Sequence, residues 1–591
     1  MVNLLLIFIK IFHSFLIMKE RSKFPLLHFL IGLLIREAFA FWTGHPWDFE
    51  VWLRVGKHVS MGGNPYIILQ RDLSLSFSPF NEMESIGYPP LAAYILAASY
   101  MLYERIGIDN KYLYYFILKQ PMIISDVIIA ILFFKYVTNT AMLFWIYNPY
   151  GILISSIWGA LDPIALLFIL LSLNYLKKNK YAFSGFSLGL ATSIKTLPII
   201  FMPQMIFSLK SVKERIKFTS LFILTFLASI LLPFLVNRWE WGGIYNCFTY
   251  QVAFPVYGAI SPFLIFEYVK DSMPLWIHNI LTTLWIVALI LSYIYSIKKK
   301  LPLNQAVLIT MITFMASRVF ASEPWLIYII SLLLLSSKNL PKRQIYTLLI
   351  VGFINLTANN TLLLWFISPI NLDAFMLAHY LNNTPPYETF RLAVREIAAL
   401  LLLQELLAII FNDLPVIYKV ANKLHKMGRT TIIVYAAFFL LTFILGLSID
   451  YTVINMVTDW KHVLEKDFFM GLNFLSTYHL LIITLFLSWI LTIVILSKKT
   501  FIEKVKLFLT LSILAIIASG IALPIFEYLR GTEILAGETL EIIGNFKMDD
   551  RVFFVLTILT ISALPAISDL DNFSEFIIKL KGFFKYLKMI V

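Results

Sequence analysis

The chain has 591 residues but very few cysteines and few charged side chains. Its single cysteine, Cys247, excludes a disulfide framework and a thiolate metal cluster. Only 14% of the residues are charged, against about 25% in soluble domains. Several water-facing domains would need more polar surface than this composition supplies. These shortages exclude a cytosolic enzyme, a disordered tail and a nucleic-acid-binding protein.

Well-known catalytic motifs are also missing. There is no P-loop glycine pattern, which argues against an ATP-driven pump. There is no HExxH motif and the histidines are scattered, so the sequence gives a zinc site little support. Inverted repeats of the transporter type are not evident in the lengths of the apolar segments.

Apolar segments, in contrast, recur from end to end. The chain is 59% hydrophobic and its mean hydropathy is +0.81. Runs near 20 residues are typical of membrane-spanning helices, whereas a β-barrel would have short alternating segments. The sequence therefore predicts an all-α, polytopic membrane protein.

The net charge of +13 is distributed in a way that predicts topology. More than half of the 48 basic residues lie in eight short clusters, from residues 19–23 to residues 579–588. We place these clusters on the cytoplasmic side by the positive-inside rule, so an even number of crossings must separate neighbours. About 14 to 16 transmembrane helices satisfy this condition. The expected spans are 24–42, 113–136, 141–158, 161–176, a broken pair within 182–209, 218–236, 275–297, 303–321, 325–337, 344–366, 395–413, 430–449, 472–497, 505–527 and 552–569. The apolar segment Leu4–Met18 is left uncounted as a signal-like or in-plane helix.

One apolar stretch, between Lys180 and Lys210, has basic residues at both ends. It should therefore enter and return as two short half-helices, broken near Lys195 because Pro198 disrupts a continuous helix. This arrangement puts Lys195 deep in the membrane or at its far face, where a charge needs a partner. A single long tilted helix is the alternative.

These spans divide the chain into four parts. Residues 1–42 form an N-terminal segment and first span, 43–112 a large first external loop, 113–414 a transmembrane core and 415–591 additional C-terminal helices. Within the loop, Leu91–Tyr103 is too short to span and follows Pro89-Pro90, so we predict an interfacial helix.

Two acids begin this loop, in the sequence Trp47-Asp48-Phe49-Glu50. A helix is expected from here through Ser60, and on a helix the two acids point about 200° apart. Glu50 precedes Arg54 by four residues, which favours an ordinary helix-surface ion pair. Asp48 is either a first-turn acid stabilised by the helix dipole or a functional carboxylate.

Ionisable residues also occur inside or at the ends of the predicted spans, where they are functional hypotheses by default. Lys119 and Asp126 lie seven residues apart on one helical face and should meet partners on neighbouring helices. The others are Asp162, Lys195, Arg318 and Glu323. A transporter that relays protons would use such residues, and so would an enzyme whose cations bind a lipid-linked phosphate.

A series of motifs, in this order, resembles the GT-C superfamily of polyprenyl-phosphate-sugar-dependent glycosyltransferases. The motifs are Asp48-x-Glu50, Gly62-Gly63-Asn64-Pro65-Tyr66, Tyr88-Pro89-Pro90-Leu91, Lys119 with Asp126, Asn148-Pro149, Trp158-Gly159-Ala160-Leu161-Asp162-Pro163 and Lys195-Thr196-Leu197-Pro198. The resemblance covers about residues 42–210, with a weaker echo at Ser322-Glu323-Pro324-Trp325. It is nearest to the GPI mannosyltransferase I catalytic subunit and to the YPPL-type glucosyltransferases of N-glycan assembly.

The resemblance implies an inverting transfer of a hexose, mannose or glucose, from a polyprenyl- or dolichyl-phosphate sugar. The acceptor is a hydroxyl on a lipid-linked glycan or another molecule at the non-cytoplasmic face. Asp48 would be the general base, and Glu50 would be the second acid of a DxE motif that is DxD in the GPI enzyme. That departure leaves a metal-independent mechanism and a Mg²⁺ or Mn²⁺ ion both open.

The resemblance also implies roles for the other ionisable residues. Lys195 would bind the donor phosphate, with Arg318 and Lys119 as weaker candidates. Tyr88, Asp126, Asp162 and Glu323 would line the donor and acceptor pocket.

The main alternative is a lipid or solute transporter with a relay through Asp126, Asp162 and Lys195, and a membrane scaffold is a third. Besides the sugar donor and the acceptor, the expected partners are membrane lipids, and no nucleic acid. The composition weakly favours a prokaryotic plasma membrane, with the active site facing outside. Trp239 and Trp241, in a later external loop, are expected to anchor at the interface.

Overall fold

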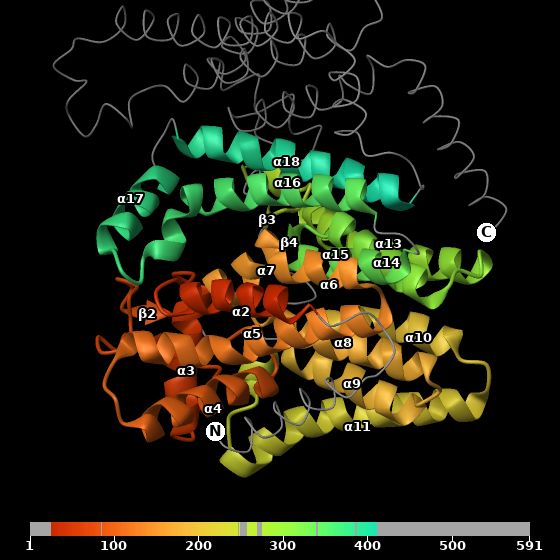
Figure 1. The fold of residues 1–591 in the computed structure, drawn as a ribbon, viewed down its shortest axis with the longest axis horizontal. Coiled ribbons are helices and arrows are strands. Elements are labelled where there is room, and N and C mark those ends of the chain that lie inside the picture. Colours follow the sequence, from red (N-terminus) through yellow and green to blue (C-terminus); the bar gives the residue numbers. More distant parts are fainter. Residues whose placement is uncertain are drawn as a thin grey trace, which may run out of the picture.

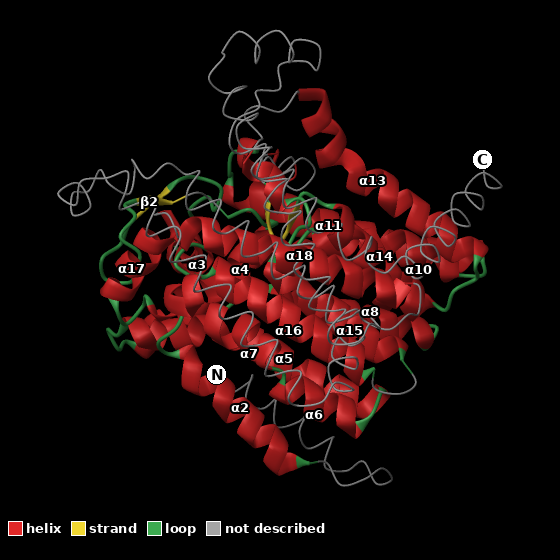
Figure 2. Cartoon of the chain, turned by 90° about the horizontal axis from the view of Figure 1, so that it is seen from above, coloured by secondary structure: helices red, strands yellow, loops and turns green. Residues whose placement is uncertain are grey.

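A computed structural model describes residues 25–83, 86–245, 248, 257–268, 275–337, 341–383 and 387–410. The described residues are 77% helical with few strands, which confirms the predicted all-α class for this part of the chain (Figures 1 and 2). The Leu4–Met18 segment, the four spans predicted after residue 410 and the 415–591 part lie outside the described residues.

The described part of the chain is built almost entirely from helices. The α-helices are α2 (Leu26–Ala40), α3 (Asp48–Ser60), α4 (Pro90–Ile106), α5 (Lys111–Tyr136), α6 (Asn139–Tyr147), α7 (Pro149–Ile152), α8 (Asp162–Lys177), α9 (Tyr181–Ile194), α10 (Met202–Ser208), α11 (Val212–Asn237), α13 (Leu275–Lys298), α14 (Leu303–Ser317), α15 (Leu326–Ser336), α16 (Lys342–Asn359), α17 (Leu372–Asn383) and α18 (Tyr387–Ile410). A π-helix, η1, covers Leu153–Trp158, and 3₁₀ turns cover η2 (Leu197–Phe201), η3 (Leu264–Tyr268), η5 (Glu323–Trp325) and η6 (Thr361–Ile367).

Three of these helices, α5, α11 and α13, are long and apolar enough to cross a membrane. Only 22% of the most apolar stretch of α11, and likewise of α13, is buried inside the protein, against 67% for α5. Exposed apolar faces of this extent suit lipid rather than water. In Figure 2, α13 projects from the border of the helical bundle, as an exposed apolar helix would.

Most predicted spans coincide with helices, but the span 141–158 does not. The chain breaks at Asn148, whose side chain accepts a hydrogen bond from the Tyr150 amide at 3.0 Å and caps α7. Pro149 follows and cannot donate to a preceding turn, so α6, α7 and η1 are separate elements. The 344–366 span was also too long, since α16 ends at Asn359 and η6 follows.

The break at Lys195 is confirmed. Lys195 meets Asp162 at the start of α8, whereas Ser184 and Met205 both contact Ser172, ten residues further along that helix. The chain therefore runs along α8 in α9, turns at Lys195 and returns through η2 and α10. A single long tilted helix is excluded, because its two ends could not both lie beside Ser172.

The predicted helix in the first loop forms as α4, but it packs against α3 in the protein core. Ala92, Ala93 and Leu96 of α4 are fully buried. A Cβ atom on Gly56 of α3 would lie 2.4 Å from the Tyr114 hydroxyl and 3.0 Å from the Leu96 carbonyl oxygen. Glycine at this position therefore lets α3 lie directly against α4 and α5.

Two small sheets connect distant segments. Strand β1 (Leu69–Gln70) pairs antiparallel with β2 (Glu82–Met83) in the first loop. Strand β3 (Gly258–Ala259) pairs parallel with β4 (Phe320–Ala321), just before η5. In Figure 1, β3 and β4 lie just below α16.

Candidate functional site

The Asp48 side chain is the first acid of α3 and is half-buried. Its Oδ2 accepts a hydrogen bond from Trp158 Nε1 at 3.0 Å, and its Oδ1 accepts none from the described residues. The position at a helix N-terminus stabilises the carboxylate, because the exposed backbone amides there carry partial positive charge. Asp48 is thus an oriented carboxylate with one oxygen left for a ligand.

The His45 ring holds this arrangement from the other side. It stacks on the Trp158 indole with ring centroids 4.4 Å apart and planes 9° apart. Its Nδ1 lies 3.3 Å from the Asp48 backbone nitrogen and accepts its hydrogen. Burial lowers the pKa of His45, while the Asp48 carboxylate and the Asn360 side chain act in the opposite direction. The imidazole is therefore a neutral acceptor in the folded protein.

Trp158 reaches Asp48 because it ends the π-helix η1, which places side chains differently from an α-helix. The turn closes at Gly159, whose φ of +79° favours glycine. A Cβ atom there would also lie 3.0 Å from the Phe49 ring and 3.2 Å from Lys119 Cε. Such π-helical turns are frequent at functional sites.

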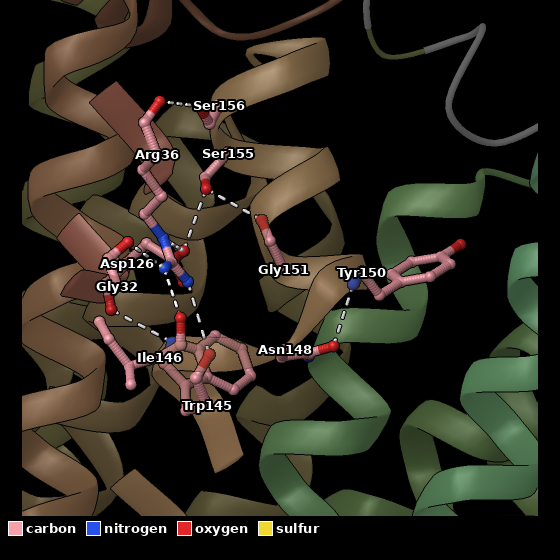
Figure 3. Close-up of polar contacts among 10 residues, drawn as sticks. All are labelled: Gly32, Arg36, Asp126, Trp145, Ile146, Asn148, Tyr150, Gly151, Ser155 and Ser156. Atoms are coloured by element: carbon pink, nitrogen blue, oxygen red, sulfur yellow. Dashed lines mark hydrogen bonds and ion pairs between the residues drawn. The ribbon is translucent and has the colours of Figure 1, made fainter. Parts of the chain in front are cut away.

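A buried ion pair between Arg36 of α2 and Asp126 of α5 fixes the same π-helix (Figure 3). Arg36 Nε lies 2.7 Å from Asp126 Oδ2, and Ser155 Oγ donates to the same oxygen at 3.0 Å. Ser156 Oγ donates to the Arg36 carbonyl oxygen. Two successive serines of η1 are therefore hydrogen-bonded to the two residues of this ion pair, Ser155 to the Asp126 carboxylate and Ser156 to the Arg36 backbone.

The remaining Arg36 hydrogens go to the backbone. Arg36 Nη1 donates to the carbonyl oxygens of Gly32 and Ile146, at 3.0 and 2.6 Å. Trp145 Nε1 donates to the Asp126 carbonyl oxygen at 3.1 Å. Figure 3 shows these groups converging on the arginine from α2, α5, α6 and η1. Arg36 is not among the residues predicted from the sequence, although it is the lone arginine of the predicted span 24–42.

Glu50 faces away from Asp48, as the helical geometry predicted. It forms the expected pair with Arg54, with 3.0 Å between Oε1 and Nε, but the pair is buried rather than on the surface. Its Oε2 accepts hydrogen bonds from the amides of Phe77 and Ser78, at 3.2 and 3.4 Å. Glu50 thus anchors the first loop, and nothing in its surroundings supports a role as a second catalytic acid.

Lys119 is enclosed in the protein. Its Nζ donates to the Thr43 carbonyl oxygen at 2.6 Å, to Thr43 Oγ1 at 2.9 Å and to the Ile157 carbonyl oxygen at 3.4 Å. An ammonium group has three hydrogens, and all three are used. These contacts leave no hydrogen of Lys119 Nζ for the predicted donor phosphate, and the residue links the first loop to η1.

Lys195 has the partner that its position required. Its Nζ lies 2.7 Å from both carboxylate oxygens of Asp162, and both side chains are buried. The Tyr88 ring covers the ammonium with 5.2 Å between Nζ and the ring centroid. Two hydrogens of Nζ are used by Asp162, which leaves the third for the Tyr88 ring or for a ligand.

Glu323 places a second carboxylate within electrostatic range of Asp48. Burial raises the pKa of Glu323, and the nearby Asp48 carboxylate adds to this, while Arg395 and Asn359 lower it. Asn359 Nδ2 donates to Glu323 Oε1. The Ser322-Glu323-Pro324-Trp325 motif thus contains a carboxylate that interacts electrostatically with Asp48. Glu50, in contrast, is engaged by Arg54 and two backbone amides.

Arg318 ends α14 inside a group of aromatic rings. Its guanidinium carbon lies 5.4 Å from the Trp285 ring centroid, 5.2 Å from that of Phe314 and 5.8 Å from that of Trp325. Trp325 follows Glu323 in η5. Arg318 is therefore held beside the segment that carries Glu323.

Two tyrosines, Tyr150 and Tyr328, connect the segments that carry Glu323 and Asp162. The Tyr150 hydroxyl donates to the Glu323 carbonyl oxygen at 2.9 Å and lies within electrostatic range of the Asp162 carboxylate. The Tyr328 hydroxyl donates to the Asp162 carbonyl oxygen at 3.3 Å. The Asp48 and Glu323 carboxylates and the Asp162–Lys195 pair consequently belong to one region of the bundle, and Tyr88 covers its lysine.

The donor atoms do not fit a resident metal ion. Within the described ranges, no three Asp, Glu, His or Cys side chains converge. Glu50, the second acid of the DxE motif, is occupied by Arg54 and two backbone amides. Asp48 and Glu50 therefore do not form a shared Mg²⁺ or Mn²⁺ site.

No family model matches this chain, and no curated protein matches it.

Proposed function

We propose that the chain is a polytopic membrane glycosyltransferase of the GT-C-like type, with about 14 to 16 spans, that transfers a hexose with inversion. The donor is a polyprenyl- or dolichyl-phosphate sugar, and the acceptor is a hydroxyl of a lipid-linked glycan. The observation that carries the proposal is the Asp48 carboxylate, fixed through one oxygen by Trp158 and open at the other. In a prokaryotic plasma membrane this site would face outside.

In this mechanism Asp48 removes the proton of the acceptor hydroxyl. The acceptor oxygen forms a bond to the anomeric carbon from the face opposite the phosphate, and the bond from that carbon to the phosphate oxygen breaks. The proton ends on Asp48 and the negative charge on the departing lipid phosphate. A carboxylate on one side and cations on the other suit such an oxocarbenium-like transition state.

Lys195 supports the phosphate end of this proposal. Its third hydrogen is not used by Asp162, and Tyr88 holds the ammonium in place. Arg318 is the second cation, since a guanidinium binds phosphate oxygens in pairs. In this proposal Glu323, Asp162 and Tyr88 would line the donor and acceptor pocket, whereas Asp126 acts at a distance by fixing η1.

The test supplies the purified full chain with polyprenyl-phosphate mannose and, separately, polyprenyl-phosphate glucose, together with a lipid-linked glycan extract. Consumption of either donor with formation of a glycosylated product is expected. Asp48→Asn should abolish the transfer without changing thermal stability. Glu50→Gln is the matched control in the same helix, and it should lower stability while each folded molecule remains active. Full transfer by Asp48→Asn would contradict the proposal.

One observation favours a transporter as the second candidate. Asp126 Oδ1 is buried and has no hydrogen-bond partner among the described residues. A relay through Asp126, Asp162 and Lys195 would then drive lipid or solute movement. Proteoliposomes that move solute with a proton gradient, and that consume no sugar donor, would select this function instead.

A further inference from the structure

A second group of aromatic rings lies directly beside Asp48. Trp47, the preceding residue, is 40% exposed. Its ring centroid lies 4.9 Å from that of Trp365 at an interplanar angle of 74°, and 5.4 Å from that of Phe80. Phe375 of α17 completes the support at 6.4 Å. We call Trp47, Phe80, Trp365 and Phe375 the Trp47 cluster.

Two of the three supporting rings, those of Trp365 and Phe375, are buried although the Trp47 ring is not. Trp365 is 3% exposed and Phe375 1%, and with Ala378 they form a hydrophobic cluster separate from the main core. Their packing fixes the orientation of Trp47 rather than hiding it. A rigid aromatic face held open to solvent is a typical element of a small-molecule site.

The Trp47 cluster is continuous with the Asp48 site. The His45 ring centroid lies 6.2 Å from that of Trp47 and 4.4 Å from that of Trp158, which is bonded to Asp48. The Gly44 amide also donates to the Phe366 carbonyl oxygen at 3.0 Å, which ties the Asp48 segment to η6. A ligand on Trp47 would therefore lie next to the carboxylate.

The exposed apolar stripe of α17 is separate from Trp47. Helix α17 exposes Leu372, Met376 and Tyr380, which lie four residues apart along one stripe. That stripe is the exposed apolar surface of this helix, and Phe375, on a different face, is the residue that contacts Trp47. The lipid-facing role therefore falls on the α17 stripe.

We propose that Trp47 forms the floor of a binding subsite for a pyranose ring of the acceptor. The apolar C–H face of a pyranose matches an exposed indole face, and the hydroxyls at its edge would reach the Asp48 carboxylate. This inference rests on the proposed function and names the acceptor as a saccharide. Stacking on an indole face depends little on the configuration of the sugar hydroxyls. The subsite therefore selects for a pyranose ring rather than for one particular hexose.

The test measures binding directly with methyl α-D-mannopyranoside and methyl α-D-glucopyranoside as probes. The full chain is kept in a sugar-free amphipol, and saturation-transfer NMR detects contact with the ring protons. Wild type should saturate these protons, and glycerol should show no effect. Trp47→Ala should weaken pyranoside binding about tenfold, whereas Trp47→Phe, which keeps a stacking face, should retain most of it.

Trp241 provides the matched control. It is 48% exposed and stacks on Phe234 at 4.6 Å, away from Asp48. Trp241→Ala should bind the pyranosides as wild type does. Equal binding by Trp47→Ala and Trp241→Ala would overturn the subsite.

Transfer kinetics separate this inference from the proposed function. In Trp47→Ala the KM for the acceptor should rise more than kcat falls, with the donor KM unchanged. Pyranoside binding that depends on Trp47, without any transfer, would retain the subsite and overturn the glycosyltransferase. Transfer with an unchanged acceptor KM in Trp47→Ala would retain the glycosyltransferase and overturn the subsite.

Discussion

Trp158 Nε1 donates a hydrogen bond to Asp48 Oδ2 over 3.0 Å, although 110 positions separate the two residues. The same indole stacks on His45, and His45 Nδ1 accepts the Asp48 backbone amide hydrogen. Carboxylate, indole and imidazole therefore form a closed loop in which each group limits the movement of the other two. The direction of the Asp48 carboxylate depends on all three.

Replacement of Trp158 by phenylalanine should slow transfer with little loss of stability. The benzene ring can still stack on His45, but the hydrogen bond to the carboxylate is lost. Hydrogen bonds to charged groups contribute about 1.5–3 kcal/mol, so we expect kcat to fall about ten- to hundredfold. Initial rates of donor consumption measure the effect.

Trp42→Phe is the matched control, because Trp42 Nε1 donates to the Ala38 carbonyl oxygen at 2.7 Å near the end of α2. It also loses one indole hydrogen bond, but away from Asp48. Equal rates in Trp158→Phe and Trp42→Phe would show that the Trp158 bond does not orient the base.

The Lys195–Asp162 pair should have separable effects on stability and on donor binding. Lys195→Met leaves a buried carboxylate without its cation, which costs about 3–5 kcal/mol of unfolding free energy. Adding Asp162→Leu removes that uncompensated charge and should recover most of the stability. Thermal unfolding of the single and double variants measures this difference.

Donor affinity should remain weak in both variants, because the ammonium that faces the phosphate is absent in each. Binding of polyprenyl phosphate to the double variant is the decisive measurement, since that protein is stable. Wild-type affinity there would remove Lys195 from the phosphate site and leave it a structural cation.

Much of the described fold could be predicted from the sequence, because helix positions follow from apolar runs. Helices α5, α8 and α13 match the predicted spans within about two residues, the usual precision of helix ends. The reversal at Lys195 was also predictable, since basic residues at both ends of a short stretch require the chain to return. The span 141–158 was mispredicted because its composition is uniformly apolar and only Asn148-Pro149 marks the break.

Less of the candidate site could be predicted, because its contacts join residues distant in sequence. The Glu50–Arg54 pair is local and was foreseen, but its burial depends on the amides of Phe77 and Ser78. The Arg36–Asp126 pair spans 90 positions, and no local pattern links the two residues. The π-helical turn that aims Trp158 likewise has no sequence signature, so tertiary packing decides it.

The Arg36–Asp126 pair should matter for both stability and rate. Asp126→Asn leaves the buried guanidinium uncompensated and loosens Ser155, so unfolding free energy should fall by about 3–5 kcal/mol. The rate should fall as well, because η1 positions Trp158 against Asp48. Thermal unfolding and donor consumption of the same preparation measure the two effects.

Asp72→Asn is the control for an ion pair at the surface. Asp72 pairs with Lys57, and both side chains are about one-third exposed, so its loss should cost about 0–1 kcal/mol. If Asp126→Asn lost as little stability as Asp72→Asn, the Arg36–Asp126 pair would not hold η1 in place.

His45 should make stability depend on pH. Burial lowers its pKa from the usual 6.5, so below that pH the unfolded chain takes up a proton that the folded chain does not bind. The unfolded state then binds more protons, and the unfolding free energy decreases as the pH falls. The contribution of His45 is fully present above pH 6.5 and is lost as the pH falls through the folded pKa.

His45→Asn isolates this contribution, because an asparagine side-chain oxygen can still accept the Asp48 amide hydrogen at the start of α3. The thermal midpoint of wild type should drop between about pH 7.5 and about pH 5.5, and that of His45→Asn should drop less. His58, whose pKa burial also lowers, is present in both proteins, so the difference belongs to His45. His28→Asn, at an exposed position, should behave as wild type, and a His45→Asn midpoint that followed the wild-type curve would assign the pH dependence to other groups.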